Sequence, residues 1–263
     1  MAETQVAFND ADAYERYMGR WSRAVGEKFL AWLAPPKNVR WLDLGCGTGA
    51  FTDLILKHGT PASVTGVDPA PAQIEHAKKS FPAAEFRVGN SMELPFKDDE
   101  FDVVASALVL HFIPDRAKAF AEMQRVTKTG GLISGYTWER SATSKGAPYV
   151  PMMKGLQSIG VEPTTSPTVP EADLTGLHQA VTRAGFRDID VSIIEGTQSY
   201  RDFDDYWQVQ TMTFHPVGKS VAALDDKKRD ELREVMRKML PPDADGKITY
   251  KARAVAFKAR PAR

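Results

Sequence analysis

The sequence predicts an α/β fold with a mostly parallel sheet and helices on both faces. Short apolar runs alternate along the 263 residues with segments of helical periodicity, and this alternation is typical of strands joined by helical crossovers. The first apolar run passes into a glycine-rich turn at residues 45–49, and a helical pattern follows at once. One α/β domain with an insertion is the expected organisation for a chain of this length.

Seven apolar runs are predicted as strands. They begin near residues 39, 64, 86, 100, 132, 189 and 248. Helical patterns occupy the intervening or flanking segments, with two helices expected in the last of them; these segments are 10–34, 50–56, the stretch after 69, 115–129, 174–184 and 202–240. Residues 140–172 are rich in Ser, Thr, Pro and Gly and are expected to form a loop.

Proline and glycine mark the expected helix ends. Pro35 and Pro36 end the N-terminal helical segment, because the residue before a proline is disfavoured in the helical conformation. Gly130 and Gly131 are expected to stop the helix over 115–129, and Gly185 the helix over 174–184.

Composition narrows the class of partner. Lys and Arg total 34 and Asp and Glu total 34, so the formal net charge is zero, which argues against a nucleic-acid partner held by bulk charge. No apolar leader or membrane-spanning run is evident, so we expect no membrane insertion and a cytoplasmic location. The five histidines show no metal-ligand spacing, and Cys46 is the only cysteine. The oligomeric state stays open.

The glycine-rich turn is the strongest functional signal. Gly45, Gly47 and Gly49 alternate with other residues, and glycine allows the backbone to approach a ligand that any Cβ would displace. The helix that follows directs its N-terminal N–H groups and the positive end of its dipole toward the same place. The sequence therefore predicts a site for the polar part of a nucleotide-like cofactor.

Two cofactors fit this turn. Gly45, Gly47 and Ala50 match the G-x-G-x-x-A pattern of NAD-binding folds, so an NAD(P)-dependent oxidoreductase remains an alternative. Asp43 favours S-adenosylmethionine, because a carboxylate there attracts the cofactor's ammonium and repels a pyrophosphate. A protein that binds S-adenosylmethionine without turnover is a third possibility, since these residues bind and do not catalyse.

Polar residues follow the next two strands. Asp68 ends the second strand and could accept hydrogen bonds from both ribose hydroxyls, although Pro69 also allows an N-cap role. Asn90 and Ser91 lie where the third strand should end. They could contact an adenine edge, or they could form an ordinary turn.

Several segments together resemble one known family. They are Leu-Asp-Leu-Gly-Cys-Gly-Thr-Gly at 42–49, Gly-Val-Asp at 66–68, Gly-Asn-Ser-Met-Glu-Leu-Pro-Phe at 89–96, Phe-Asp-Val-Val at 101–104 and Val-Thr-Lys-Thr-Gly-Gly at 126–131. In order and spacing, the chain from about Val39 to Trp138 resembles a class I S-adenosylmethionine-dependent methyltransferase, of the group that includes the ubiquinone and menaquinone C-methyltransferases. The resemblance implies a Rossmann-like seven-stranded fold and methyl transfer to a small organic acceptor.

The resemblance also implies roles for individual residues. The backbone of the glycine turn, at Gly45, Gly47 and Gly49, lies beside the methionine portion of the cofactor. Asp68 holds the ribose. The adenine is surrounded by Asn90, Ser91 and Met92. The family more often has Asp at position 90, and Asn keeps a carbonyl acceptor but loses the charge.

His111 is the candidate catalytic residue. It follows the fourth strand, near the place where the transferred methyl sits in this fold. If the acceptor must lose a proton, a neutral imidazole with a pKa near neutrality suits a general base. Packing beside Phe112 is the alternative.

Substrate binding is expected from the segments outside the core motif. The single domain divides into a cap (1–36), a cofactor-binding core (37–139), and a possible lid made of the 140–172 loop and a 200–245 insertion. In the cap, Tyr14 or Arg20 could bind the cofactor's methionine carboxylate, and a helix whose aromatic residues only pack on the core is the alternative. The candidate substrate contacts are Trp138, Trp207 and His215, for which core packing is the alternative.

Overall fold

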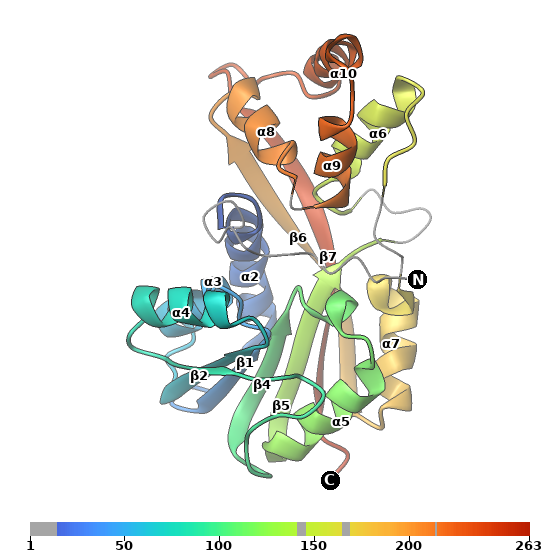
Figure 1. The fold of residues 1–263 in the computed structure, drawn as a ribbon. Helices are drawn as coiled ribbons and strands as arrows, with labels where there is room; N and C mark the ends of the chain where they lie inside the picture. Colours follow the sequence, from blue (N-terminus) through green and yellow to red (C-terminus); the bar gives the residue numbers. More distant parts are fainter. Residues whose placement is uncertain (1–14, 141–145, 165–168, 214) are drawn as a thin grey trace.

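A seven-stranded sheet forms the centre of the protein, in the order β3-β2-β1-β4-β5-β7-β6 (Figure 1). The computed structural model describes residues 15–140, 146–164, 169–213 and 215–263. The strands are β1 (Arg40–Leu44), β2 (Ser63–Asp68), β3 (Glu85–Val88), β4 (Phe101–Ala107), β5 (Thr127–Trp138), β6 (Arg187–Tyr200) and β7 (Ile248–Arg260). The predicted α/β class and the mostly parallel sheet are confirmed.

The first five strands run parallel. Trp41 of β1 pairs with Val64 of β2 on one side and Val103 of β4 on the other. Strand β7 is antiparallel to both β5 and β6. Since parallel strands end at the same edge, the loops after β1 to β5 converge there, as binding loops do in open α/β sheets.

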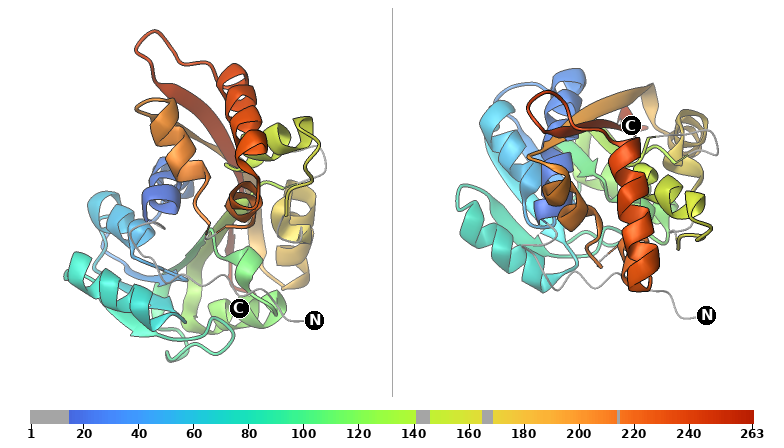
Figure 2. Two further views of the ribbon diagram at one scale, coloured as in Figure 1. Left: turned by 45° about the horizontal axis from the view of Figure 1, so that its top comes forward. Right: turned by 90° about the horizontal axis from the view of Figure 1, so that it is seen from above.

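Helices cover both faces of this sheet (Figures 1 and 2). The chain forms a π-helical turn (Glu15–Gly19), α2 (Arg20–Leu33), α3 (Ala50–His58), α4 (Pro71–Ser80), a 3-10 turn (Leu110–Phe112), α5 (Arg116–Val126), α6 (Val150–Ser158), a 3-10 turn (Pro170–Ala172), α7 (Leu174–Arg183), α8 (Phe203–Gln210), α9 (Pro216–Ala222) and α10 (Asp226–Met239). Helices α2 and α3 bury their apolar sides against one face of the sheet, and α5 and α7 bury theirs against the other.

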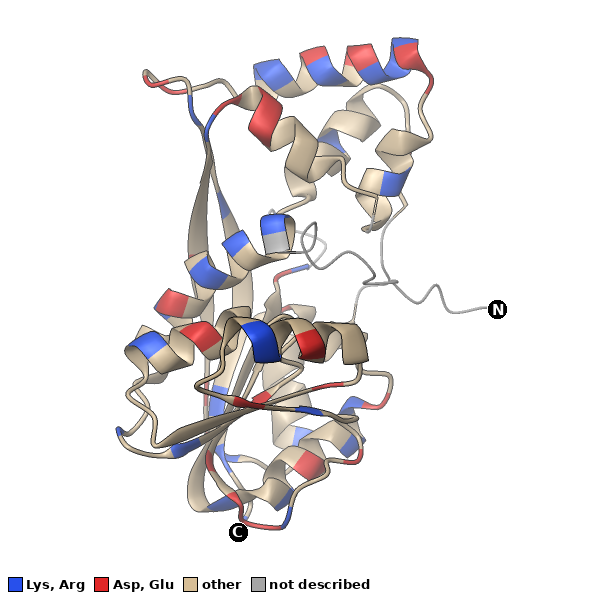
Figure 3. Cartoon of the chain, turned by 60° about the vertical axis from the view of Figure 1, so that its left-hand side comes forward, with Lys and Arg blue, Asp and Glu red and all other residues tan. Residues whose placement is uncertain are grey.

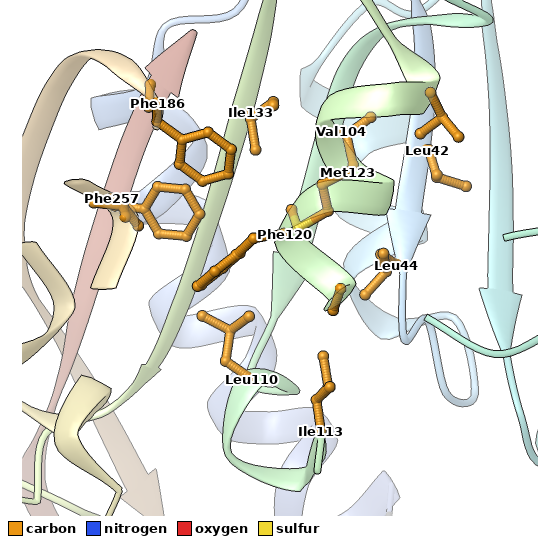
Figure 4. Close-up of a cluster of buried hydrophobic side chains, with 14 of the residues drawn as sticks. Leu42, Leu44, Val104, Leu110, Ile113, Phe120, Met123, Ile133, Phe186 and Phe257 are labelled. Atoms are coloured by element: carbon orange, nitrogen blue, oxygen red, sulfur yellow. The ribbon is translucent and has the colours of Figure 1, made fainter. Parts of the chain in front are cut away.

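The core under α5 is built from aromatic and aliphatic side chains of the central strands (Figure 4). Phe120 of α5 meets Phe186 and Phe257 edge-on, at centroid distances of 5.5 and 6.0 Å. Edge-to-face pairs at this spacing add to the free energy of burial. This packing anchors α5, whose first turn adjoins the loop carrying His111.

Strands β6 and β7 extend past the rest of the sheet and carry a separate group of helices. The pairing of β5 with β7 ends at Trp138↔Ala254, while β7 continues to pair with β6 as far as Ile248↔Tyr200. Helices α6, α8, α9 and α10, which we call the helical lobe, gather on this ribbon (Figure 2). A cluster including Leu156, Tyr206 and Leu232 forms the lobe's own apolar core. The lobe therefore lies beyond the carboxyl ends of the strands.

Three expectations about secondary structure were wrong. Residues 140–172 contain helix α6, whose buried side chains pack against α10. The 202–240 segment holds three helices where two were expected. Helix α5 ends at Val126, and Gly130 and Gly131 lie inside β5, where the pairing with β4 shifts register between Phe101 and Val103. A glycine at positive φ suits such a bulge.

Charges of both signs are interspersed over the surface, as Figure 3 shows along α10. The basic residues near the C-terminus have acidic partners: Lys251 pairs with Glu195 at 2.7 Å and Arg253 with Glu139 at 3.2 Å. This distribution agrees with the zero net charge. Among the described residues, no helix has the length and apolarity to cross a membrane.

Candidate functional site

The carboxyl ends of the parallel strands bring together the main candidates. The glycine turn follows β1, Asp68 ends β2 and Asn90 comes two residues after β3. His111 lies in the 3-10 turn that follows β4. The parallel pairing of β3, β2, β1 and β4 puts all four at one edge of the sheet.

Each glycine of the turn has a backbone conformation that side chains disfavour. The φ angles of Gly45, Gly47 and Gly49 are +77°, +54° and +92°. A Cβ on Gly45 would lie 2.5 Å from Val109, and one on Gly49 would lie 2.6 Å from Phe81. The glycines are therefore needed by the protein's own packing as well as by the positive φ angles.

The side chain of Asp68, at the end of β2, is hydrogen-bonded to the backbone of the glycine turn that follows β1. Its Oδ2 accepts a hydrogen bond from the N–H of Gly47 at 3.0 Å, and its Oδ1 accepts one from Ala70 at 2.9 Å. Burial raises the pKa of this carboxyl, while these two bonds oppose the rise. A carboxylate offers about four acceptor positions, so two remain for a pair of hydroxyl groups. Gly49, the N-cap of α3, has no side chain that could cap the helix, and helix N-termini can bind polar or anionic groups.

Asp43 lies behind the glycine turn. The side chain is 0% exposed, and its Oδ2 accepts a 2.6 Å hydrogen bond from the Thr52 hydroxyl of α3. Oδ1 is buried without a hydrogen-bond partner. Burial raises the carboxyl pKa to about 7, and the negative charge of Asp68 adds to the rise against the opposing bond from Thr52. The geometry ties β1 to α3, and the expected contact with a cofactor ammonium stays a prediction.

The predicted adenine residues form a tight turn. Asn90 Oδ1 accepts a hydrogen bond from the N–H of Met92 at 2.9 Å, and Asn90 O accepts one from Glu93 at 3.0 Å. The Asn90 side chain is exposed, whereas Ser91 is half-buried and Met92 packs against the core. The turn interpretation thus describes the local geometry, and adenine binding by these residues remains a prediction.

His111 is anchored to the fifth strand. Its Nδ1 lies 2.9 Å from the hydroxyl oxygen of Thr137, and its ring lies 3.9 Å from that of Phe112. Burial of the ring lowers its pKa to about 3, and the positive charges of Arg140 and Arg116 contribute to the shift. The expected pKa near neutrality was wrong, because packing and charge both disfavour the imidazolium.

Further polar residues surround His111 that sequence reasoning did not single out. Arg116 Nε lies 3.0 Å from Glu171 Oε2, and its Nη1 donates to Ile113 O at 2.9 Å. The backbone N–H of Arg140 donates to Ala172 O at 2.8 Å, and burial raises the pKa of the Tyr149 phenol while the Arg140 side chain opposes the rise. We call Arg116, Arg140, Tyr149 and Glu171 the arginine cluster. In the sequence, only the position of Arg140 shortly after the strand β5 could have indicated these residues.

The cap residues have other neighbours. Arg20 Nη1 lies 3.2 Å from Asp205 Oδ2 of the helical lobe, and its guanidinium carbon is 5.7 Å from the centroid of the Tyr200 ring. Tyr14 lies outside the described residues. The binding of a methionine carboxylate by either residue is still a prediction.

The candidate substrate residues take part in packing. Trp138 is 4% exposed and meets Trp21 edge-on at 6.1 Å. Trp207 stacks on Phe203 at 6.1 Å within the lobe. His215 caps α9 by accepting from the N–H of Gly218, and burial lowers its pKa to about 4. Substrate contact by Trp138, Trp207 or His215 stays a prediction.

No metal centre is formed within the described ranges, where no group of three or more His, Cys, Asp or Glu side chains has the arrangement to hold an ion.

Comparison of the sequence with known families matches residues 42–134 to a methyltransferase domain. The malonyl-[acyl-carrier protein] O-methyltransferase of Serratia marcescens is 33% identical over 129 residues, which are 47% of this chain and 50% of that protein. The demethylmenaquinone methyltransferase of Staphylococcus aureus is 38% identical over 101 residues, 37% of this chain and 42% of that protein. This chain thus spans about half the length of the relatives it matches.

The fold has solved counterparts. The structure of a putative methyltransferase from Bacillus halodurans superimposes with a TM-score of 0.58 at 15% identity, covering 90% of this chain and 99% of that one. At this identity the likeness concerns the fold.

Proposed function

We propose that the chain, whose residues 42–134 match a methyltransferase domain, transfers a methyl group from S-adenosylmethionine to a small organic acceptor. The observation that carries the proposal is the contact of Asp68 with the glycine turn. This contact puts a partly buried carboxylate with spare acceptor capacity beside the backbone that would hold the cofactor.

The proposed roles of the cofactor-binding residues are based on their positions. Asp68 would accept hydrogen bonds from the ribose hydroxyls, and the turn containing Gly45, Gly47 and Gly49 would run beside the methionine portion. Asn90, Ser91 and Met92 would border the adenine. S-adenosylmethionine, when bound, supplies an electrophilic methyl on a sulfonium, so alignment and exclusion of water account for much of the rate.

On the acceptor side, His111 is the proposed catalytic residue. Its ring is neutral at physiological pH, since its pKa is about 3, so it can donate or accept a hydrogen bond. Thr137 holds Nδ1, which leaves Nε2 to contact the acceptor. The helical lobe, with Trp207 and His215, and the strand end at Trp138 are proposed to enclose the acceptor.

The proposal also concerns the kind of molecule that the protein acts on and the cellular compartment in which it works. A small molecule is the proposed acceptor in place of a nucleic acid, because charges of both signs are interspersed and paired on the surface. Cytoplasmic action is proposed as well, since the one cysteine, Cys46, is a buried free thiol beside the cofactor turn, as expected in a reducing compartment.

Calorimetry with purified protein tests the cofactor. S-adenosylmethionine and S-adenosylhomocysteine should bind, and NADH should bind far more weakly. Asp68→Ala should cost about 2–4 kcal/mol of binding free energy, because it removes two charge-assisted acceptors. Asp230→Ala, at an exposed carboxylate of α10, is the matched control and should bind normally.

Tight NADH binding, or unchanged affinity in Asp68→Ala, would overturn the proposed cofactor. Transfer of labelled methyl to a panel of small acceptors then separates an enzyme from a protein that only binds the cofactor. Binding without transfer to any acceptor would favour the latter.

A further inference from the structure

Two polar side chains of helix α8 are buried within the helical lobe. Tyr206 and Gln210 are four positions apart, so they are neighbours on one side of the helix. Both residues are 0% exposed. Among the residues that the structure describes, neither the hydroxyl oxygen of Tyr206 nor Oε1 of Gln210 has a hydrogen-bond partner. Buried polar groups in folded proteins are nearly always paired, so these two atoms are suited to binding a polar group of a ligand.

A chain of hydrogen bonds fixes the orientation of the Gln210 amide. The Tyr250 hydroxyl donates its one hydrogen to Pro148 O at 3.0 Å. In the 3.4 Å pair of Tyr200 and Tyr250, the Tyr200 hydroxyl must therefore be the donor. Tyr200 in turn accepts from Nε2 of Gln210 at 3.0 Å. Because an amide turned the other way would place its oxygen against a hydroxyl with no hydrogen left, Oε1 is the atom that stays available as an acceptor.

The two available atoms define the chemistry of the group that would pair them. Burial raises the pKa of the Tyr206 phenol well above its usual value, and Tyr200 adds to the rise, so Tyr206 keeps its hydrogen as a donor. The oxygen of Gln210 only accepts. A hydroxyl group serves both, because it donates one hydrogen bond and accepts another. A carboxylate has no hydrogen to donate, and an ammonium has no lone pair to accept with.

Aromatic rings surround Tyr206. Its ring meets that of Tyr200 edge-on at a centroid distance of 5.4 Å and that of Tyr250 at 5.9 Å, and the ring of Phe203 lies 6.0 Å away. Burial of a charged group among such rings is strongly unfavourable. These surroundings therefore favour an uncharged group on an apolar molecule.

The aromatic contacts continue from α8 to the edge of the sheet. Helix α8 follows β6, lies beyond the carboxyl ends of the strands and contacts the π-helical turn of the cap (Figure 1). Tyr250, which contacts Tyr206, lies 5.2 Å from Trp21, and Trp21 lies 6.1 Å from Trp138 at the end of β5. The end of β5 also holds the ring of His111. Packed rings thus fix the position of α8 relative to the proposed active site.

We propose that Tyr206 and Gln210 bind an uncharged hydroxyl group of the methyl acceptor within the helical lobe. The hydroxyl donates to Gln210 Oε1 and accepts from the Tyr206 hydroxyl, so that both buried groups are paired. This inference rests on the proposed methyl transfer and adds the class of the substrate. Tyr206 and Gln210 are then specificity-determining residues, and analogues without the hydroxyl bind poorly because they leave both groups unpaired.

Matched probes test the preference for a hydroxyl. The probe 2-naphthol is compared with 2-methoxynaphthalene, which has no hydrogen to donate, and with the anion 2-naphthoate, by calorimetry on protein saturated with S-adenosylhomocysteine. Phenol and anisole repeat the comparison with a smaller ring. At least one hydroxyl probe should bind about tenfold more tightly than its methyl ether, and 2-naphthoate should bind more weakly than 2-naphthol. Equal binding within both pairs, or no binding of either hydroxyl probe, would overturn the inference.

Tyr206→Phe removes only the hydroxyl group. It should weaken binding of the preferred hydroxyl probe about tenfold and leave the affinity for the methyl ether unchanged. The thermal stability of the ligand-free protein should not fall, because the variant loses no hydrogen bond within the protein. A loss of stability with parental affinity for the hydroxyl probe would mean that Tyr206 has a structural role only.

Gln210→Leu tests the other half of the pair. It should weaken the hydroxyl probe about tenfold while the methyl ether binds as it does to the parent. Gln208→Leu, at an exposed glutamine of the same helix, is the matched control and should bind both probes normally. Since Gln210→Leu also removes the bond to Tyr200, equal losses for the two probes would assign Gln210 to structure and not to recognition.

Kinetics connect the pair with the acceptor. With any acceptor that receives the labelled methyl, Tyr206→Phe should raise KM about tenfold and leave kcat nearly unchanged. An unchanged KM would exclude Tyr206 from acceptor binding. Failure of the protein to bind S-adenosylhomocysteine would refute the proposed function and this inference with it, whereas normal cofactor binding without a hydroxyl preference would refute only this inference.

Discussion

Thr52 Oγ1 donates a 2.6 Å hydrogen bond to Asp43 Oδ2, and this bond links the first turn of α3 to the strand that precedes the glycine turn. Both side chains are 0% exposed. The bond therefore sets the spacing between β1 and α3, the two elements that hold the proposed cofactor turn between them. The second carboxylate oxygen of Asp43 is buried without a partner, so this link is sensitive to the ionisation of Asp43.

Asp43→Asn should flatten the pH dependence of stability. The folded-state pKa of Asp43, about 7, lies above its value of 3.8 in the unfolded chain. Its contribution to stability is thus fully present below pH 3.8 and is lost as pH rises through 7. Between pH 5 and pH 8 the loss should be about 2–3 kcal/mol in the cofactor-free parent.

Urea denaturation of parent and variant at the two pH values measures the difference. The change between pH 5 and pH 8 should be smaller in Asp43→Asn by that amount, since the amide does not titrate. Thr52→Val should destabilise the protein by about 1–3 kcal/mol, and Thr52→Ser by less, because only serine retains a hydroxyl donor. An equal pH dependence in parent and Asp43→Asn would mean that Asp43 is ionised throughout.

Gly49→Ala should destabilise more than Gly130→Ala. Both glycines have positive φ, +92° and +74°, but a Cβ on Gly49 would lie 2.6 Å from the Phe81 ring, whereas one on Gly130 would have no atom within 4 Å. The backbone penalty of about 1–2 kcal/mol is common to both, and overpacking adds about 1–3 kcal/mol at Gly49. Thermal unfolding of the two variants compares them, and equal losses would show that Phe81 yields to the new methyl group.

His111 should stay neutral across the physiological pH range. Its pKa of about 3 lies below the unfolded value of 6.5, so its contribution to stability is present above pH 6.5 and is lost as pH falls toward 3. The turnover number should not fall between pH 8 and pH 5.5 through this residue. Ring chemical shifts of His111, assigned with His111→Gln, measure the titration, and an inflection near pH 6.5 would contradict the packing seen here.

His111→Ala should lower the turnover number about 10- to 100-fold, the effect of losing one hydrogen bond to the reacting acceptor. Thr137→Val should lower it less, because Thr137 acts only by holding the ring at Nδ1. Affinity for S-adenosylhomocysteine is the control and should not change in either variant. A folded His111→Ala protein with parental turnover would exclude His111 from the reaction.

Arg20 should stabilise the contact between the cap and the helical lobe more than it contributes to cofactor affinity. The ion pair with Asp205 is partly exposed, so Arg20→Gln and Asp205→Asn should each cost about 1 kcal/mol of stability, and the double variant should cost less than their sum. A double-mutant cycle in urea measures the coupling. A tenfold loss of S-adenosylmethionine affinity in Arg20→Gln, absent from Asp205→Asn, would instead support a contact with the methionine carboxylate.

Sequence patterns predicted the central sheet well, because each signal was local. The strand at Asp43, the glycine turn and the acid at Asp68 lie within 26 residues of one another, and backbone preferences and alternation alone identify them. The parallel pairing in the structure brings them to one edge of the sheet. The family match over residues 42–134 covers this same region.

Composition gave wrong predictions of secondary structure where tertiary packing outweighs local residue preferences. Helix α6 forms in a segment rich in Pro and Gly because Met152 and Leu156 are buried against the lobe. Gly130 and Gly131 were expected to end a helix, yet the sheet accommodates them as a bulge in β5. In each case the deciding contacts come from residues far along the chain, which a local pattern does not contain.

By itself the sequence determined the class of fold and the position of the glycine-rich turn, because both depend on neighbouring residues. Only the tertiary structure decided what surrounds these groups. It buried Asp43 against Thr52, paired Arg20 with Asp205 across 185 positions, and set two arginines near His111. Burial and the charge of distant partners set the pKa values of Asp43 and His111, and these contacts arise only when the chain has folded.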